Sequence, residues 1–141
     1  PWVDEFASQT VAQRVMPGAR IAIDRHRRAG DRLVLMSASV DLYVPKLGAL
    51  LGFDAVICTQ VQWFGEVLDG RLAGENCRGE EKSRQLAGLR ERHPGASIVA
   101  YGNSLSDVPH LLLSERGVFI NAPPRARLML ERQGLTCESW R

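Results

Sequence analysis

The loop from Tyr101 to Asp107 carries the side chains that are most suited to chemistry. It follows the apolar residues Ile98-Val99-Ala100 and reads Tyr-Gly-Asn-Ser-Leu-Ser-Asp. Asn103 and Asp107 offer oxygen atoms to Mg²⁺, a cation that prefers octahedral oxygen ligands and keeps several waters. The same side chains are also typical of turns and helix caps, so the loop by itself leaves both interpretations open.

Two other polar groups occupy comparable places in the sequence. Ser37 directly follows the apolar run 33–36, and its hydroxyl, with the backbone N–H groups around Ala38, could bind phosphate oxygens. Lys82 stands in the first turn of a predicted helix, where an ammonium could neutralise charge on a phosphoryl group. Taken singly, Ser37 to Ser39 would be an ordinary helix cap and Lys82 an exposed lysine. The interpretation as a phosphate site therefore depends on the order of these residues along the chain and on their shared position at strand ends.

Strand-like and helix-like segments alternate along the chain and position these groups. The apolar runs predict strands at 33–36, 55–58, 97–101 and 118–120, and the amphipathic stretches predict helices at 17–29, 40–51, 80–93, 108–114 and 124–133. Such alternation indicates an α/β fold with a mostly parallel sheet covered by helices on both faces. Ligands of such sheets bind beyond the carboxyl ends of the strands, which is where Ser37 and the Gly102–Asp107 loop are expected.

Three segments fall outside this alternation. Residues 61–72 predict a small hairpin whose turn is Asp69-Gly70. Residues 1–16 carry Trp2, Phe6 and Val11 at roughly helical spacing, with no strand before them. The segment 135–141 gives no prediction beyond a packing role for Trp140.

Composition narrows the class of protein. The length of 141 residues suits one domain with a real core, and a net charge of +2 is too small to indicate nucleic-acid binding. Three widely spaced cysteines argue against a disulfide framework or a zinc site, and they favour a reducing compartment such as the cytoplasm. No apolar run is long enough to span a membrane.

In combination, the motifs resemble those of the haloacid dehalogenase-like (HAD) superfamily, in particular the branch of the phosphoserine phosphatases (subfamily IB). The resemblance covers about residues 17–130. It rests on Leu33-Val34-Leu35-Met36-Ser37-Ala38-Ser39, on Gly79-Glu80-Glu81-Lys82, on the run from Tyr101 to Leu111, and on Val118-Phe119-Ile120-Asn121-Ala122-Pro123.

This resemblance implies a three-layer Rossmann-like core and a Mg²⁺-dependent phosphomonoesterase that works through an aspartyl-phosphate. Ser37, with Ala38, would bind the transferring phosphoryl group, and Lys82 would balance the charge on it. Asn103 would stand where the family usually has a metal-binding Asp, and Asp107 would support the metal, directly or through water. The implied substrate is a small phosphorylated metabolite such as phosphoserine.

The sequence departs from the family at the nucleophile. The family's first motif, an Asp-x-Asp after an apolar strand, does not occur here, and Asp24, the only superficial candidate, lies within a predicted helix. We therefore expect an incomplete, inactive fragment in which residues 1–16 are the end of a helical cap and residues 17–141 the core. Two alternatives remain open, namely a receiver-like signalling domain and a non-catalytic binding or assembly module derived from a phosphatase.

Overall fold

The chain forms two compact units. A computed structural model describes residues 2–141, except for the side chain of Trp63. The N-terminal unit runs up to Cys77, and the C-terminal unit runs from Arg78 to Arg141. Each unit has its own parallel strands and its own helices, which confirms the predicted α/β class. The predicted boundary between residues 16 and 17 stays a prediction.

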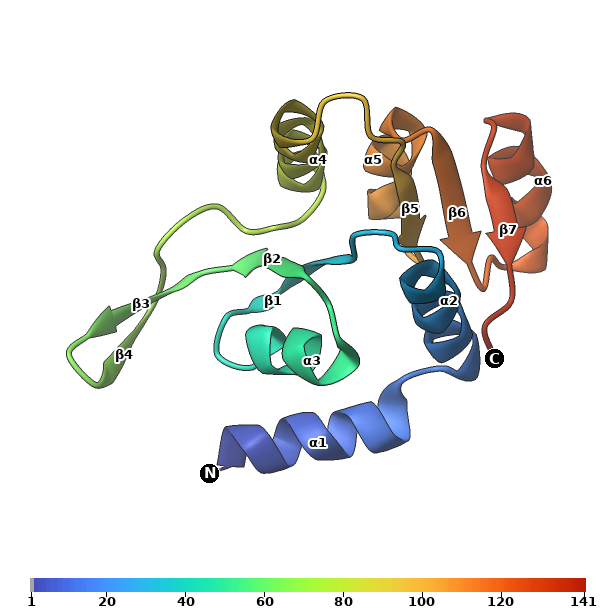
Figure 1. The fold of residues 1–141 in the computed structure, drawn as a ribbon. Helices are drawn as coiled ribbons and strands as arrows, with labels where there is room; N and C mark the ends of the chain where they lie inside the picture. The colour runs from blue at the N-terminus through green and yellow to red at the C-terminus, as the bar shows by residue number, and fades with distance from the viewer. Residues whose placement is uncertain (1) are drawn as a thin grey trace. The chain divides into compact units, whose positions relative to one another are not determined.

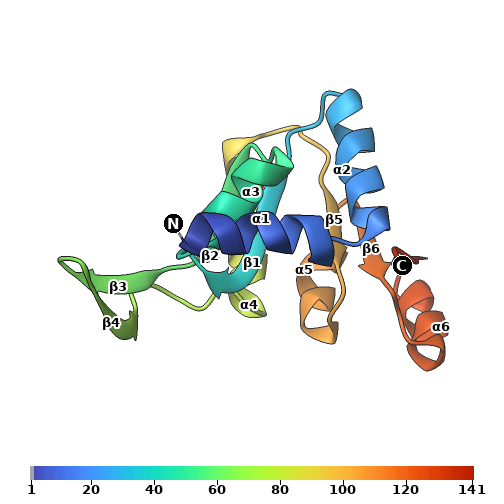
Figure 2. The same ribbon diagram turned by 90° about the horizontal axis from the view of Figure 1, so that it is seen from below.

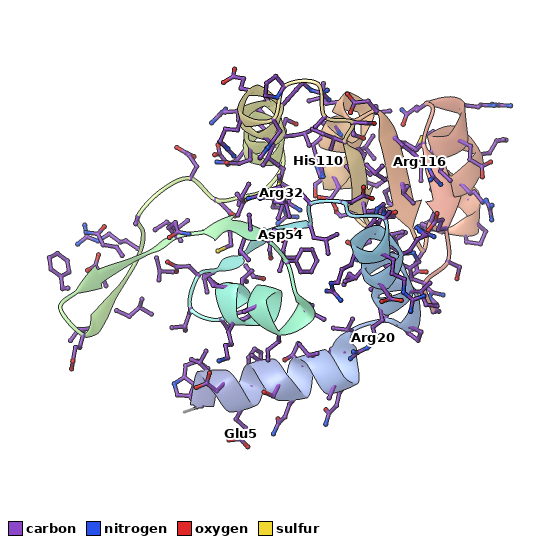
Figure 3. All side chains as sticks on the ribbon, in the orientation of Figure 1. Glu5, Arg20, Arg32, Asp54, His110 and Arg116 are labelled. Carbon is purple, nitrogen blue, oxygen red and sulfur yellow. The ribbon has the colours of Figure 1, made fainter. Side chains whose placement is uncertain are left out.

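The N-terminal unit begins with two helices. Its elements are α1 (Trp2–Arg14), α2 (Pro17–Arg28), β1 (Val34–Val40), α3 (Val44–Leu51), β2 (Ala55–Thr59), β3 (Val61–Phe64) and β4 (Val67–Leu72). As predicted, α2 begins at Pro17, whose fixed φ suits the first turn of a helix. Helix α1 lies along α3, as both views show (Figure 1, Figure 2). Phe6 meets Tyr43 edge to face with ring centroids 5.2 Å apart, while Glu5 lies on the side of α1 away from α3 (Figure 3).

Strand β1 is longer than the sequence predicted. It pairs in parallel with β2 and continues through Ser37, Ala38 and Ser39 to Val40, so Ser37 lies within the strand and not, as the sequence predicted, directly after it. The reason lies in the ladder, which pairs Ser37 with Cys58 and Val40 with Thr59. Two residues of β1 therefore oppose none of β2 and form a bulge within the strand. Helix α3 correspondingly begins at Val44, later than the predicted residue 40, with Pro45 in its first turn.

The predicted hairpin is present, but its turn is not at Asp69-Gly70. Strands β3 and β4 are antiparallel, and the pairing of Phe64 with Val67 places the turn at Gly65-Glu66 (Figure 1). Gly65 has a φ of 58°, which glycine adopts without steric cost. Asp69 and Gly70 lie instead where the register of β4 shifts, so the turn-like dipeptide forms a bulge.

The C-terminal unit contains three parallel strands in the order β5-β6-β7. Its elements are α4 (Glu80–Arg92), β5 (Val99–Gly102), the short 3-10 helix η1 (Leu105–Asp107), α5 (Val108–Leu113), β6 (Arg116–Ile120), α6 (Pro124–Arg132) and β7 (Thr136–Glu138). The core of this unit is formed by Leu111, Phe119, Leu130 and Leu135. Strand β7 was not predicted, since its three residues alternate too briefly to give a signal. The rings of Trp140 and Tyr101 pack with centroids 5.3 Å apart, which fits the packing role expected for Trp140.

No helix within residues 2–141 combines the length and the apolar character that crossing a bilayer requires.

Candidate active site

Asp107 closes the loop that follows β5. Its side chain is buried, and Oδ2 accepts hydrogen bonds from the backbone N–H groups of Asn103, at 3.3 Å, and Ser104, at 3.2 Å. The hydroxyl oxygen of Ser104 in turn accepts from the backbone N–H of Ser106 at 3.3 Å. These bonds form a capping box, which fixes the loop at the start of η1.

Gly102 allows the loop to fold back this tightly. A Cβ atom at this position would lie 2.7 Å from the Cβ of Asp107 and 2.9 Å from its Oδ2. No ordinary side chain fits at such distances, so the Gly and the Asp of this motif depend on each other.

Lys82 contacts the same carboxylate from α4. Its Nζ lies 2.8 Å from Oδ1 of Asp107, and the exposed fractions of the two side chains are 15% and 7%. A largely buried ammonium is stable only next to an opposite charge, and Asp107 provides it. The structure thus brings together two of the predicted site residues, and both belong to the C-terminal unit.

His110 is a member of this neighbourhood that the sequence did not reveal. It lies on α5, which packs against β5 (Figure 3), and is buried, with an Nδ1 that has no hydrogen-bond partner among residues 2–141. Burial lowers the pKa of His110, and the charge of Lys82 lowers it further, against the opposing effect of Asp107. The available signal was a histidine between Pro109 and Leu111 on a short apolar helix.

Asn103 is exposed at the end of β5, and its side chain makes no hydrogen bond within the described part of the chain. Its amide oxygen is therefore available to a cation. Asp107, by contrast, already has one oxygen at an ammonium and the other at two N–H groups. Residues 2–141 contain no group of three or more acidic, histidine or cysteine side chains that could hold a metal. Of the two predicted metal ligands, Asn103 thus has an amide oxygen that is unbonded among residues 2–141, whereas both carboxylate oxygens of Asp107 are already engaged. A Mg²⁺ site here would need further oxygen ligands, and the metal role of both residues stays a prediction.

Ser37 and Ala38 belong to the N-terminal unit, in the bulge of β1. The Oγ atom of Ser37 accepts a hydrogen bond from the backbone N–H of Ser39 at 3.1 Å. The proton of the same hydroxyl has no acceptor among the described residues and can be donated to an anion. This geometry suits phosphate binding, which stays a prediction for both residues.

Asp24 has the location that the sequence predicted. It lies within α2, half exposed, and its Oδ2 is 3.0 Å from the guanidinium of Arg28 one turn later. An exposed helical carboxylate paired in this way is typical of a solvated helix face.

Comparison with known proteins places these motifs in a family. The model of the haloacid dehalogenase-like hydrolases matches residues 1–112. Among curated proteins, phosphoserine phosphatase SerB1 of Mycobacterium tuberculosis is 26% identical over 141 residues, which cover 98% of this chain and 46% of that protein. Protein CicA of Caulobacter vibrioides is 34% identical over 115 residues, covering 78% of this chain and 50% of that protein. The chain spans about half the length of the curated relatives it matches.

Solved structures agree on the fold. A protein of unknown function from Bordetella pertussis has a TM-score of 0.80 and 23% identity, with 96% of this chain and 63% of that chain covered. A substrate-bound phosphoserine phosphatase has a TM-score of 0.68 and 21% identity, with 86% and 57% covered. Because the family model matches residues 1–112, which are most of this chain, the chain belongs to the haloacid dehalogenase-like hydrolases.

Proposed function

We propose that this chain is the core part of a Mg²⁺-dependent phosphomonoesterase of the phosphoserine phosphatase type, which works through an aspartyl-phosphate. The observation that carries the proposal is the Lys82–Asp107 pair, a largely buried ammonium held at the loop after β5. The names of the curated relatives support the same class of substrate, a small phosphorylated metabolite such as phosphoserine.

Each site residue has a defined task in this proposal. Ser37 donates its hydroxyl proton to a phosphoryl oxygen, and the backbone around Ala38 adds N–H donors. Lys82 neutralises charge that develops on the phosphoryl oxygens, since phosphoryl transfer depends on positioning and charge neutralisation. Asn103 would hold the cation through its amide oxygen, and Asp107 would support it, directly or through water.

Magnesium, when bound, would supply positive charge next to the transferring group. Asn103 brings no negative charge, in contrast to the Asp that the family usually has there. Further carboxylates are therefore needed for strong binding, and the proposal assigns them, with the nucleophile, to residues outside this chain. We accordingly expect that this chain alone does not hydrolyse phosphomonoesters. Its three cysteines favour a reducing compartment, and we propose the cytoplasm.

The test compares the full-length gene product with the chain of 141 residues. Phosphate release from a panel of phosphomonoesters is measured with Mg²⁺ and with a chelator. The full-length protein should release phosphate only with Mg²⁺, and Lys82→Met should lower kcat by a factor of about 100 or more. Lys46→Met, which removes an exposed lysine that pairs with Asp4, is the matched control and should leave kcat unchanged.

Two outcomes would contradict the proposal. A full-length protein that hydrolyses no phosphomonoester would favour the alternative of a non-catalytic module, which the lack of an Asp-x-Asp in these residues supports. Turnover by the 141-residue chain that survives Asp24→Ala would show that it contains another nucleophile and is not an incomplete enzyme.

A further inference from the structure

Thr59 is a buried polar residue that the proposed reaction does not use. It ends β2 with an exposed fraction of 2%, and its side chain is among the largest in the N-terminal unit that are fully buried. Its hydroxyl contacts three backbone or side-chain groups from two other segments: the carbonyl oxygen of Ala38 at 2.7 Å, Oδ1 of Asn76 at 3.2 Å, and the backbone nitrogen of Cys77 at 3.0 Å.

The hydroxyl proton belongs to the bond with Ala38. A threonine hydroxyl has a single proton, and the Ala38 carbonyl is the nearer of the two acceptors by 0.5 Å, the difference between 3.2 and 2.7 Å. The lone pairs of Oγ1 accept from the N–H of Cys77, and the amide of Asn76 can donate to them when it is turned over. Thr59 is thereby fully satisfied, which explains why a polar side chain is tolerated at this depth.

The carbonyl that Thr59 binds belongs to the peptide that orients Ser37. The oxygen of Ala38 and the N–H of Ser39 lie in one rigid peptide plane. On one edge of this plane the oxygen accepts from Thr59, and on the other the N–H donates to Oγ of Ser37 at 3.1 Å. Thr59 therefore fixes the orientation of a plane that in turn holds the hydroxyl oxygen of Ser37.

The backbone of Thr59 fixes the far end of the same bulge. Its carbonyl oxygen accepts from the N–H of Asp41 at 2.9 Å, and Val40 is its partner in the ladder. The side chain of Asp41 then accepts from the N–H of Val61, the first residue of β3, at 3.1 Å. The two residues without ladder partners, Ala38 and Ser39, are consequently held from both sides by one threonine.

We propose that Thr59 is a positioning residue for the phosphate-binding segment Ser37–Ser39, acting through the Ala38–Ser39 peptide on the hydroxyl of Ser37. The inference rests on the proposed function, because it requires that the segment binds phosphate. Without the Thr59 hydroxyl, the partly buried carbonyl oxygen of Ala38 loses its donor and the peptide plane loses the contact that orients it. Ser37 then loses the N–H donor that holds its hydroxyl oxygen in place.

The test uses the 141-residue chain and inorganic phosphate, followed through the backbone amide signals of residues 37–39, with potassium chloride at matched ionic strength as the salt control. Thr59→Val keeps the shape and removes the hydroxyl, and we expect the Kd for phosphate to rise about fivefold or more. Thr59→Ser restores the hydroxyl and should bring the Kd to within about twofold of the original. Asn76→Ala removes only the longer contact and is the matched control, with the same expected Kd as the original chain.

The outcomes separate the inference from the proposed function. If phosphate shifts no amide of residues 37–39 beyond the effect of chloride, the phosphate role of the segment fails and the inference fails with it. If the original chain binds and Thr59→Val binds equally well, or if Thr59→Ser is as weak as Thr59→Val, only the inference is overturned. Should Thr59→Val not fold, the unmodified chain decides: phosphate should shift the amide of Cys77 with the same midpoint as that of Ser39, and an unchanged Cys77 amide overturns the inference.

Discussion

The Nζ atom of Lys82 lies 2.8 Å from Oδ1 of Asp107, and the bond joins two motifs that are 25 residues apart in the chain. Oδ2 of the same carboxylate is bonded to two backbone N–H groups of the loop after β5. Asp107 therefore links the position of Lys82 to the shape of the loop. Both the stability of the C-terminal unit and its chemistry should depend on this one side chain.

Removal of Lys82 should destabilise the C-terminal unit. Lys82→Met leaves the Asp107 carboxylate buried without its counter-charge, and we expect a loss of about 3 kcal/mol in the free energy of unfolding. Urea unfolding, followed by the amide signals of the unit, measures this loss. Adding Asp107→Asn should recover part of it, because the unpaired buried charge is then gone. Lys46→Met, at an exposed pair, should leave the midpoint nearly unchanged, and an equal effect of both methionines would contradict the argument.

A methyl group at Gly102 should disturb the loop. Gly102→Ala places a Cβ 2.7 Å from the Cβ of Asp107, and overpacking of this kind typically costs about 1–3 kcal/mol. Thermal unfolding should show the loss, and the amide signals of Asn103 and Ser104 should move. Gly74→Ala is the matched control, because a Cβ there meets no atom within 4 Å and the backbone φ is not positive. A shift in Tm that is the same for both variants would speak against a steric cause.

The sequence predicted most of the C-terminal unit because local signals and tertiary structure agree there. Helix α4 ends where Pro94 and Gly95 predicted, β5 is a half-buried apolar run, and β6 is buried except for Arg116. The Gly102–Asp107 loop could be predicted because glycine, serine and aspartate at the end of an apolar run favour a turn and a helix cap. The contact between Lys82 and Asp107 could not be predicted from the spacing of the two residues in the sequence, because it depends on how α4 packs next to the Gly102–Asp107 loop.

The N-terminal unit shows what a sequence pattern cannot decide. Asp69-Gly70 favours a tight turn, but the register of β3 and β4 places the turn at Gly65-Glu66. Ser37 to Ser39 were expected beyond the end of the strand because serine is polar, whereas they lie within it and the hydroxyl of Thr59 donates to the carbonyl oxygen of Ala38 from β2. The role of Thr59 was not predicted either, because the sequence around a threonine at the end of an apolar run does not show which groups its hydroxyl will bond.

Glu115 should titrate far below an ordinary glutamate. The guanidinium of Arg90 and the backbone N–H of Ile98, which is 2.8 Å from Oε2, lower its pKa from 4.5 to about 2. Carboxyl carbon shifts recorded against pH measure this value directly. Arg90→Met should raise the pKa towards 4.5, although the bond from Ile98 keeps it lower. Arg84→Met, which removes an arginine paired with Glu80 and Glu81, should leave the titration of Glu115 unchanged.

The sign of the effect on stability follows from this lowered pKa. The folded protein holds Glu115 as a carboxylate more strongly than the unfolded chain does, so the contribution is complete above about pH 4.5 and is lost as the pH falls towards 2. Arg90→Met should therefore unfold with a weaker dependence on pH in that window. An unchanged dependence would mean that the pair does not persist in solution.

His110 should make the stability of the protein depend on pH in a second window, which lies at higher pH than that of Glu115. Burial lowers the pKa of this histidine below 6.5 in the folded protein, so on acidification the unfolded chain binds a proton first. Stability that is present above pH 6.5 should consequently be lost as the pH falls below it. His110→Met removes both the proton and the Nδ1 atom that has no partner among residues 2–141, while it keeps a flexible apolar side chain in the space.

Urea unfolding of the two proteins at pH 8 and pH 5.5 tests this prediction. At pH 8 we expect His110→Met to be as stable as the original chain or more stable by about 1 kcal/mol, because an unsatisfied buried polar atom is removed. At pH 5.5 the difference in its favour should widen, since only the original chain loses stability through proton uptake by residue 110. Other titrating groups are common to both proteins and cancel in this difference. A difference that is the same at both pH values would show that His110 takes up its proton equally well in the folded and unfolded chains, which its burial on α5 beside Lys82 argues against.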